Sequence, residues 1–351
     1  MTRNQATRAV WAGAVVAGLV ASAPLAAHDH DTTGPAVTAA FAPDGRLWRV
    51  ATSDHSLLVD SSTDLGLSFG PPVVIEPARQ RLHADAEGPA QIAVDGDGTI
   101  RVAWNADARD AMQTFVVSSV DNGRTFGAPV SPEIKGQSAG SELRPLLFSH
   151  RDRADLFFLR PEPSGKSYGR LYRSVLATGT PVTVSPVATS TCECCRLDGA
   201  QDTDGSVVIL SRMVFDGGIR DFGIVRIAAD GQASPVLRVT DDDWRIDACP
   251  EHGAALAIGA DGRYHMAWFT QGRKRQGLFY ASSADRGVTW SAPVRIGSEA
   301  ALAGHADLLT LNGKVFLTWQ QFDGTHTSIR RSTVPARTST STITPSGGIV
   351  M

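Results

Sequence analysis

Residues 97–104 read Asp-Gly-Thr-Ile-Arg-Val-Ala-Trp, a two-residue turn followed by a segment in which every second residue is large and apolar. Turns of the Asp-Gly and Asn-Gly type join antiparallel strands, so this stretch predicts a β-hairpin. Four similar copies and one degenerate copy occur along the chain, at Asp44-Gly45, Asp152-Arg153, Asp204-Gly205, Asp261-Gly262 and Asn312-Gly313. The six starts are 51 to 57 residues apart. We therefore predict an all-β protein, a six-bladed β-propeller of four-stranded antiparallel blades.

A second repeat, offset from the first, follows the pattern S-x-D-x-G-x-[ST]-[FW] in the first, second and fifth units. Its serine and aspartate side chains can bond turn amides, its glycine supplies a positive φ, and its aromatic residue fills the gap between strands. We interpret it as a structural device. The positions are Ser62, Asp64, Gly66 and Phe69, then Ser119, Asp121, Gly123 and Phe126, then Ser283, Asp285, Gly287 and Trp290.

The two repeats together resemble the Asp-box (BNR) repeats of the sialidase superfamily, over about residues 36 to 335. Sialidases of this family hydrolyse terminal sialic acids with an arginine triad, a Tyr-Glu nucleophilic pair and an acidic general acid. The Arg-Ile-Pro segment that carries the first arginine is missing, since the region reads Ala36 to Phe41, and no tyrosine occurs from Ala301 to Met351. The resemblance therefore implies the fold without the sialidase catalytic set.

The two ends of the chain have compositions of their own. In residues 1–27, Arg3 and Arg8 precede an apolar run and then small residues, the pattern of a secretory signal. We expect a flexible leader at 28–35, a disordered Ser/Thr-rich tail at 336–351, and ring closure by the strand near Val37 to Phe41. The mature protein is then expected in the periplasm or secreted, with no membrane span.

The net charge is −3 and basic clusters are missing, so nothing indicates nucleic acid as a partner. We expect a monomer with a small-molecule, metal or glycan ligand.

Unusual residue types gather where the chain leads into the innermost strand of each blade, which places them at the mouth of the central channel. The metal-ligand candidates there are Cys192, Cys194, Cys195, Cys249, His252, His305 and His83. Thiolate with imidazole suits copper or zinc. Three interpretations stay open: a disulfide from Cys192 or Cys194 to Cys249, a metal site, or a reactive thiol.

The leader adds a separate metal candidate. Signal cleavage after Ala27 would start the mature chain with His28-Asp29-His30, and a free amine, two amides and the imidazole of His30 can bind Cu(II). A flexible acidic leader without a ligand is the alternative interpretation.

Charged residues at the predicted mouth suggest an anion site. Arg144, Arg196 and Arg245 could bind a carboxylate beside Glu87, Glu142 and Asp247, or they could form ordinary ion pairs. The sequence thus favours a non-catalytic exported binding protein that handles copper or another thiophilic metal. The alternative is a glycan-directed hydrolase, related to exo-sialidases, with an altered site.

Overall fold

The computed structural model describes residues 36–350 except 54–55, 77–80, 85–86, 109–110, 133–142, 163–167, 178–182, 300, 336–341 and 344–346. All described residues fall in one compact unit, Thr33–Met351, in which every regular element is a β-strand. None of these described elements is a helix that could cross a membrane. The expected signal and leader, with His28 and His30, lie outside the described residues.

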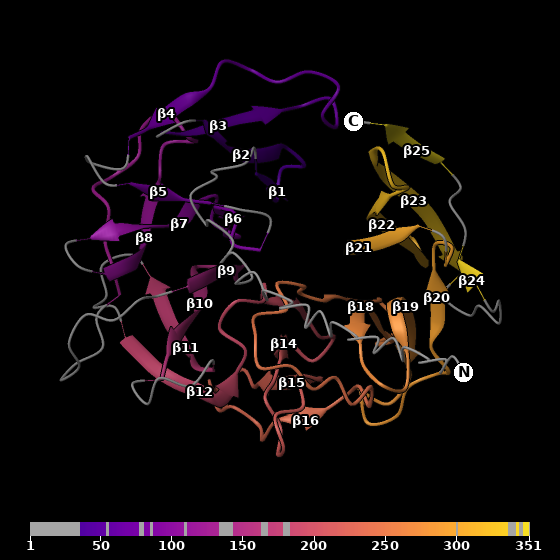
Figure 1. Ribbon diagram of the computed structural model, residues 1–351. Coiled ribbons are helices and arrows are strands. Elements are labelled where there is room, and N and C mark those ends of the chain that lie inside the picture. The colour runs from indigo at the N-terminus through magenta and orange to yellow at the C-terminus, as the bar shows by residue number, and fades with distance from the viewer. Residues whose placement is uncertain are drawn as a thin grey trace, which may run out of the picture. The chain divides into compact units, whose positions relative to one another are not determined.

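The strands form six antiparallel blades arranged as a β-propeller, which confirms the predicted fold (Figure 1). Blade 1 is β1 (Val37–Phe41), β2 (Leu47–Ser53), β3 (Ser56–Ser62) and β4 (Val73–Ile75). Blade 2 is β6 (Gln91–Val94), β7 (Ile100–Ala108) and β8 (Ala111–Ser119), extended by β5 (Leu82–His83) on β7 and by a bridge between Val116 and Val130. Blade 3 is β9 (Leu143–Ser149), β10 (Arg153–Pro161), β11 (Gly169–Ala177) and β12 (Thr183–Thr191).

The second half of the chain repeats the arrangement. Blade 4 is β13 (Asp198–Gln201), β14 (Val207–Arg212), β15 (Phe222–Ile227) and β16 (Leu237–Arg238). Blade 5 is β17 (Ala255–Ile258), β18 (Tyr264–Gln271), β19 (Gln276–Ser283) and β20 (Val294–Ile296). Blade 6 is β21 (Leu302–Leu311), β22 (Lys314–Phe322), β23 (Thr327–Pro335) and β25 (Gly347–Val350). Each of the six predicted turns lies between the first two strands of its blade.

The two chain ends differ from expectation. The strand β1 pairs with β2 of its own blade, Val37 opposite Ala51, so the prediction that it closes the ring by joining the last unit is wrong. In the tail expected to be disordered, β24 (Thr342–Ile343) pairs with β20 and β25 pairs with β23. The physical reason is the edge of β23, whose backbone groups need a partner that β25 supplies.

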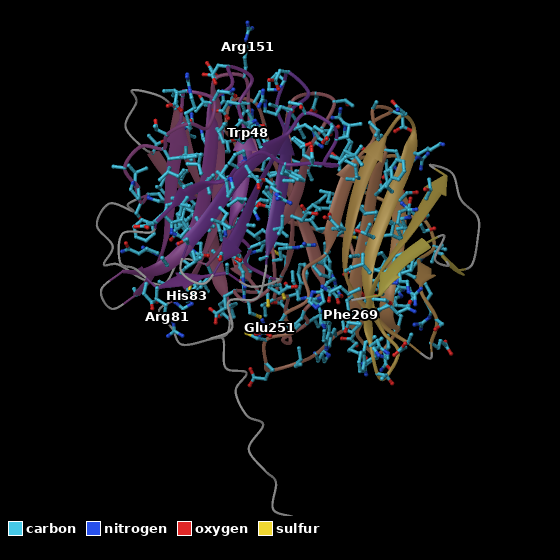
Figure 2. The ribbon with its side chains drawn as sticks, turned by 90° about the horizontal axis from the view of Figure 1, so that it is seen from above. Trp48, Arg81, His83, Arg151, Glu251 and Phe269 are labelled. Carbon is cyan, nitrogen blue, oxygen red and sulfur yellow. The ribbon has the colours of Figure 1, made fainter. Side chains whose placement is uncertain are left out.

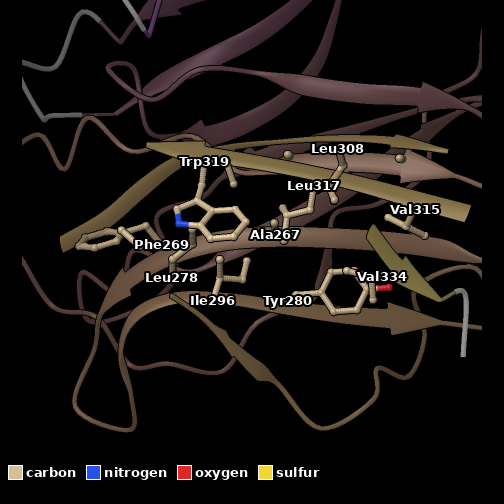
Figure 3. Packing of buried hydrophobic residues seen from close by; sticks show 14 of the residues in the cluster. Ala267, Phe269, Leu278, Tyr280, Ile296, Leu308, Val315, Leu317, Trp319 and Val334 are labelled. Carbon is tan, nitrogen blue, oxygen red and sulfur yellow. The ribbon is translucent and has the colours of Figure 1, made fainter. Parts of the chain in front are cut away.

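Blades pack face to face through apolar side chains. Between blades 5 and 6, Leu317 and Trp319 on β22 lie against Ala267 on β18 and Tyr280 on β19 (Figure 3). Interior strands such as β14 are buried at every position because a neighbouring blade covers each face. This packing holds the segments that lead into the innermost strands in place at the end of the channel.

The repeated S-x-D turns share one hydrogen-bond pattern. In blade 5, Ser283 Oγ accepts the amide of Gly287 at 2.8 Å, and Asp285 accepts the amide and hydroxyl of Thr289 at 2.8 and 2.6 Å. Hydrogen bonds from Thr289 and Ser283 lower the pKa of Asp285 to about 2. The bonds satisfy the turn locally, in keeping with a structural interpretation.

Candidate metal and ligand site

One end of the propeller collects the segments that lead into the innermost strands of blades 2, 4, 5 and 6. Figure 2 shows His83, Glu251 and Phe269 toward this end, and Arg151 at the opposite end. The segments meet because successive innermost strands pack on one another, β13 on β17 and β17 on β21. Residues more than a hundred positions apart therefore come into contact there.

Glu87, from blade 2, binds three other blades. Its Oε2 accepts the backbone amides of Arg196 at 2.7 Å and Gly253 at 2.8 Å, and its Oε1 lies 3.1 Å from Nδ1 of His305. The side chain of Glu87 is buried. Burial alone would raise the pKa of Glu87, but the hydrogen bonds from His305 and the Arg196 amide lower it below its usual value. The ionised side chain of Glu87 thus connects segments of blades 2, 4, 5 and 6 at the channel mouth.

Three thiols form the most concentrated set of ligand atoms. A turn at 193–195 points Cys192, Cys194 and Cys195 to one side, and their exposed fractions are 0, 6 and 0%. Cys192 Sγ lies 3.5 Å from the Sγ of both other cysteines, and all three Sγ atoms are within 4.8 Å of one another. None of the four cysteines is in a disulfide. Ligand sulfurs around one zinc ion lie about 3.8 Å apart, so the thiols are spaced for a metal ion.

The thiols are protonated without a metal ion. The hydrogen bond with Cys194, together with burial, raises the pKa of Cys192 to about 12, and burial raises that of Cys195. A bound cation would reverse this, because metal binding displaces the thiol protons. The fourth cysteine, Cys249, comes from the segment that leads into blade 5. It is exposed, and a hydrogen bond with Cys194 lowers its pKa.

Two buried arginines lie behind the thiols. Arg220 Nη1 is 3.4 Å from Cys192 Sγ, and the Arg212 backbone carbonyl accepts the Cys192 amide at 2.7 Å. The Arg212 guanidinium donates to the carbonyls of Arg220, His252 and Phe269 at 2.8, 2.8 and 2.9 Å. It stacks between Phe222 and Trp244, 4.1 and 4.6 Å from their ring centroids. Arg212 and Arg220 therefore border the sulfur cluster, and Arg220 also interacts electrostatically with the carboxyl group of Glu193.

The histidines do not join the cysteines. Among the described residues, the three cysteines are the only set of three or more ligand groups within 4.8 Å of one another. The ring of His252 lies 4.8 Å from that of His305 and 4.1 Å from Phe269. Its Nδ1 is buried without a hydrogen-bond partner in the described part of the chain, and burial lowers its pKa to about 4. Sulfur and imidazole candidates thus form two neighbouring groups.

Two carboxyl groups interact in the channel. Asp198 begins β13, and its Oδ2 accepts the amide of Leu256 at 2.8 Å. Burial and the charge of Asp307 raise the pKa of Asp198 to about 7 against the effect of Arg196. Arg196 donates to the carbonyl of Ala306 at 2.9 Å. Asp198 is thereby about half protonated near pH 7.

Several sequence candidates lie elsewhere. His83 pairs with Asp107 at 2.8 Å in blade 2, and Arg245 pairs with Asp243 at 2.9 Å on the surface. Asp247 is exposed, and Arg144 is partly buried with a φ of +57°. Glu142, His28 and His30 lie outside the described residues. The structure therefore places Arg196 and Glu87 together and directs Arg245 to another partner.

Arg212 and Arg220 were not among the residues that the sequence predicted for the site. Arg212 ends β14, whose other positions are buried and mostly apolar, and a charged residue there is the one signal that could have pointed to it. Arg220 lies in the loop before β15 and carries no pattern. Their positions relative to the cysteines depend on how blade 4 folds.

Comparison with known proteins shows a likeness in structure alone. No family model and no curated protein matches the sequence. An α-L-arabinanase of Penicillium chrysogenum, solved with arabinobiose, superposes with a TM-score of 0.57 at 11% identity, over 85% of this chain and 92% of that one. A Hadza microbial sialidase superposes with a TM-score of 0.56 at 14% identity, over 86% of this chain and 66% of that one. The NanB sialidase of Streptococcus pneumoniae superposes with a TM-score of 0.55 at 10% identity, over 84% of this chain and 66% of that one.

The chain thus spans just under two thirds of these sialidases and nearly all of the arabinanase. At these identities the likeness concerns the fold and not the activity. The chain is a six-bladed β-propeller similar to those of sialidases and arabinanases.

Proposed function

We propose that the protein is an exported, non-catalytic binding protein that holds a thiophilic metal ion, copper or zinc, at the mouth of its propeller. The observation that carries the proposal is the mutual approach of the Cys192, Cys194 and Cys195 sulfurs, all within 4.8 Å and buried. Thiolates bind soft and borderline metals, and buried thiols gathered at this spacing without a disulfide fit that use.

The test is the metal content of the full-length protein, purified under reducing conditions and loaded with Cu(I) or Zn(II). We expect one ion per chain, lost in Cys192→Ser and in Cys195→Ser. The control is Ser190→Ala, a change close in sequence that removes no sulfur. Less than a tenth of an equivalent in the unmodified protein, or full loading of both serine variants, would contradict the proposal.

Export rests on residues 1–27 and is part of the proposal. We expect the protein in a periplasmic or secreted fraction to begin at His28, which amino-terminal sequencing can establish. A chain that still begins at Met1 in the cytoplasmic fraction alone would contradict export.

A second candidate is a glycan-directed hydrolase, and one observation favours it. Asp198 and Asp307 interact beside Arg196, and the pKa of Asp198 is raised to about 7. Glycosidases use one protonated and one ionised carboxyl group. Aryl glycosides of sialic acid and of arabinofuranose would test it. Hydrolysis that disappears in Asp198→Asn supports this candidate, and none with either substrate excludes these two activities.

A further inference from the structure

Two arginines beside the thiols bear on which metal ion binds there. This question rests on the proposed metal binding. The side chains of Arg220 and Arg212 are 3% and 1% exposed. The hydrogen bonds of Arg212 go to three carbonyl oxygens, which are neutral. A buried guanidinium gains stability when a negative charge forms close to it.

A metal–thiolate complex supplies that negative charge. Three thiolates around a monovalent ion carry two net negative charges, and around a divalent ion one. Arg220 Nη1, at 3.4 Å from Cys192 Sγ, is placed to donate a charge-assisted hydrogen bond to the bound sulfur. Such contacts to ligand atoms typically change metal affinity about 10- to 100-fold.

The number of available sulfur ligands also bears on which ion binds. Three sulfurs meet here, and no imidazole or carboxylate of the described residues joins them within 4.8 Å. Structural zinc is almost always tetrahedral with four ligands, whereas all-thiolate surroundings also select Cu(I). The fourth cysteine, Cys249, is exposed. The buried set by itself is three-coordinate.

We infer that the ion is copper(I), bound by Cys192, Cys194 and Cys195, and that Arg220 with Arg212 stabilises the anionic copper–thiolate complex. Arg220 is a positioning and charge-balancing residue that does not ligate the ion. Cys249 is not needed for affinity.

The experiment is an anaerobic competition between the full-length protein and a chromogenic Cu(I) chelator, repeated with a Zn(II) dye. We expect tighter binding of Cu(I) than of Zn(II). Arg220→Met weakens Cu(I) binding about 10- to 100-fold and Arg220→Lys restores part of it. The matched control is Arg101→Met, which removes a buried arginine of blade 2 paired with Asp95 and leaves the affinity unchanged.

The outcomes separate the two proposals. If the unmodified protein binds neither ion, the proposed function fails and this inference with it. If it binds copper but Arg220→Met binds equally well, the inference alone is overturned. If Zn(II) binds more tightly than Cu(I), the ion is not copper, and if Cys249→Ser abolishes binding, the site needs the fourth thiol; either result overturns the inference. Circular dichroism of each variant confirms that it is folded.

Discussion

The carboxylate of Glu87 accepts the backbone amide of Gly253 at 2.8 Å, although 166 residues separate the two in the chain. The same oxygen also accepts the amide of Arg196, so one side chain connects blades 2, 4 and 5. Because Arg196 directly follows Cys195, this bond also holds the sulfur cluster in position. The stability of the channel mouth and the geometry of the thiols are therefore linked.

Replacing Glu87 by glutamine should lower the free energy of unfolding by about 2 kcal/mol, because hydrogen bonds to an ionised acceptor are worth about 1.5 to 3 kcal/mol. Urea denaturation of the metal-free protein measures it. Glu162→Gln is the control, since Glu162 pairs with Arg170 near the surface and should change stability by less than about 1 kcal/mol. Equal effects of the two substitutions on the free energy of unfolding would contradict the role of Glu87 as a stabilising link between blades.

Glycine at 123 is required by contact as well as by conformation. It has a φ of +74°, and a Cβ there would lie 2.4 Å from the Trp48 ring of blade 1. Gly98 has a similar φ of +86°, but a Cβ added there would meet no atom within 4 Å. We expect Gly98→Ala to cost about 1 to 2 kcal/mol from backbone strain and Gly123→Ala clearly more. Thermal unfolding of both variants tests this, and similar melting temperatures would refute the contact with blade 1.

Stability should decline as the pH falls from 6.5 to 4. Burial lowers the pKa of both His252 and His265 to about 4, so the unfolded chain takes up these protons first, near its ordinary value of 6.5. Their contribution is complete above pH 6.5 and is lost progressively toward pH 4. Urea midpoints between pH 7.5 and 4 measure the slope.

His265 Nδ1 lies 2.7 Å from the Tyr280 hydroxyl in blade 5, away from the thiols. His265→Gln should therefore reduce the slope, and so should His252→Gln. A slope that neither substitution alters would assign the pH dependence to other groups.

Metal binding should stabilise the fold, because the folded state already holds the three sulfurs within 4.8 Å of one another, whereas the unfolded chain must order them first. At a free ion concentration 100 times the dissociation constant, the gain is at most about 2.7 kcal/mol. Differential scanning fluorimetry with reduced copper should raise the melting temperature of the unmodified protein and not that of Cys192→Ser. An equal rise in both would indicate binding outside the cluster.

The sequence by itself determined the architecture. Turns such as Asp97-Gly98 and alternating apolar residues such as Ile100, Val102 and Trp104 are local signals, and their period of 51 to 57 residues sets the number of blades. It also indicated that the segments around Cys192 and Cys249 would meet at one end, because equivalent positions of a cyclic repeat share a rim.

Only the tertiary structure decided which of these side chains share a site. The buried sulfur cluster contains Cys192, Cys194 and Cys195, while His252 and His305 lie with Phe269 and Glu87 instead. Arg220 reaches Cys192 from a loop without any pattern. β24 and β25 likewise pair with edges that only the assembled blades present. Local patterns specify turns and strands, whereas side-chain direction and charge placement depend on packing between segments far apart in the chain.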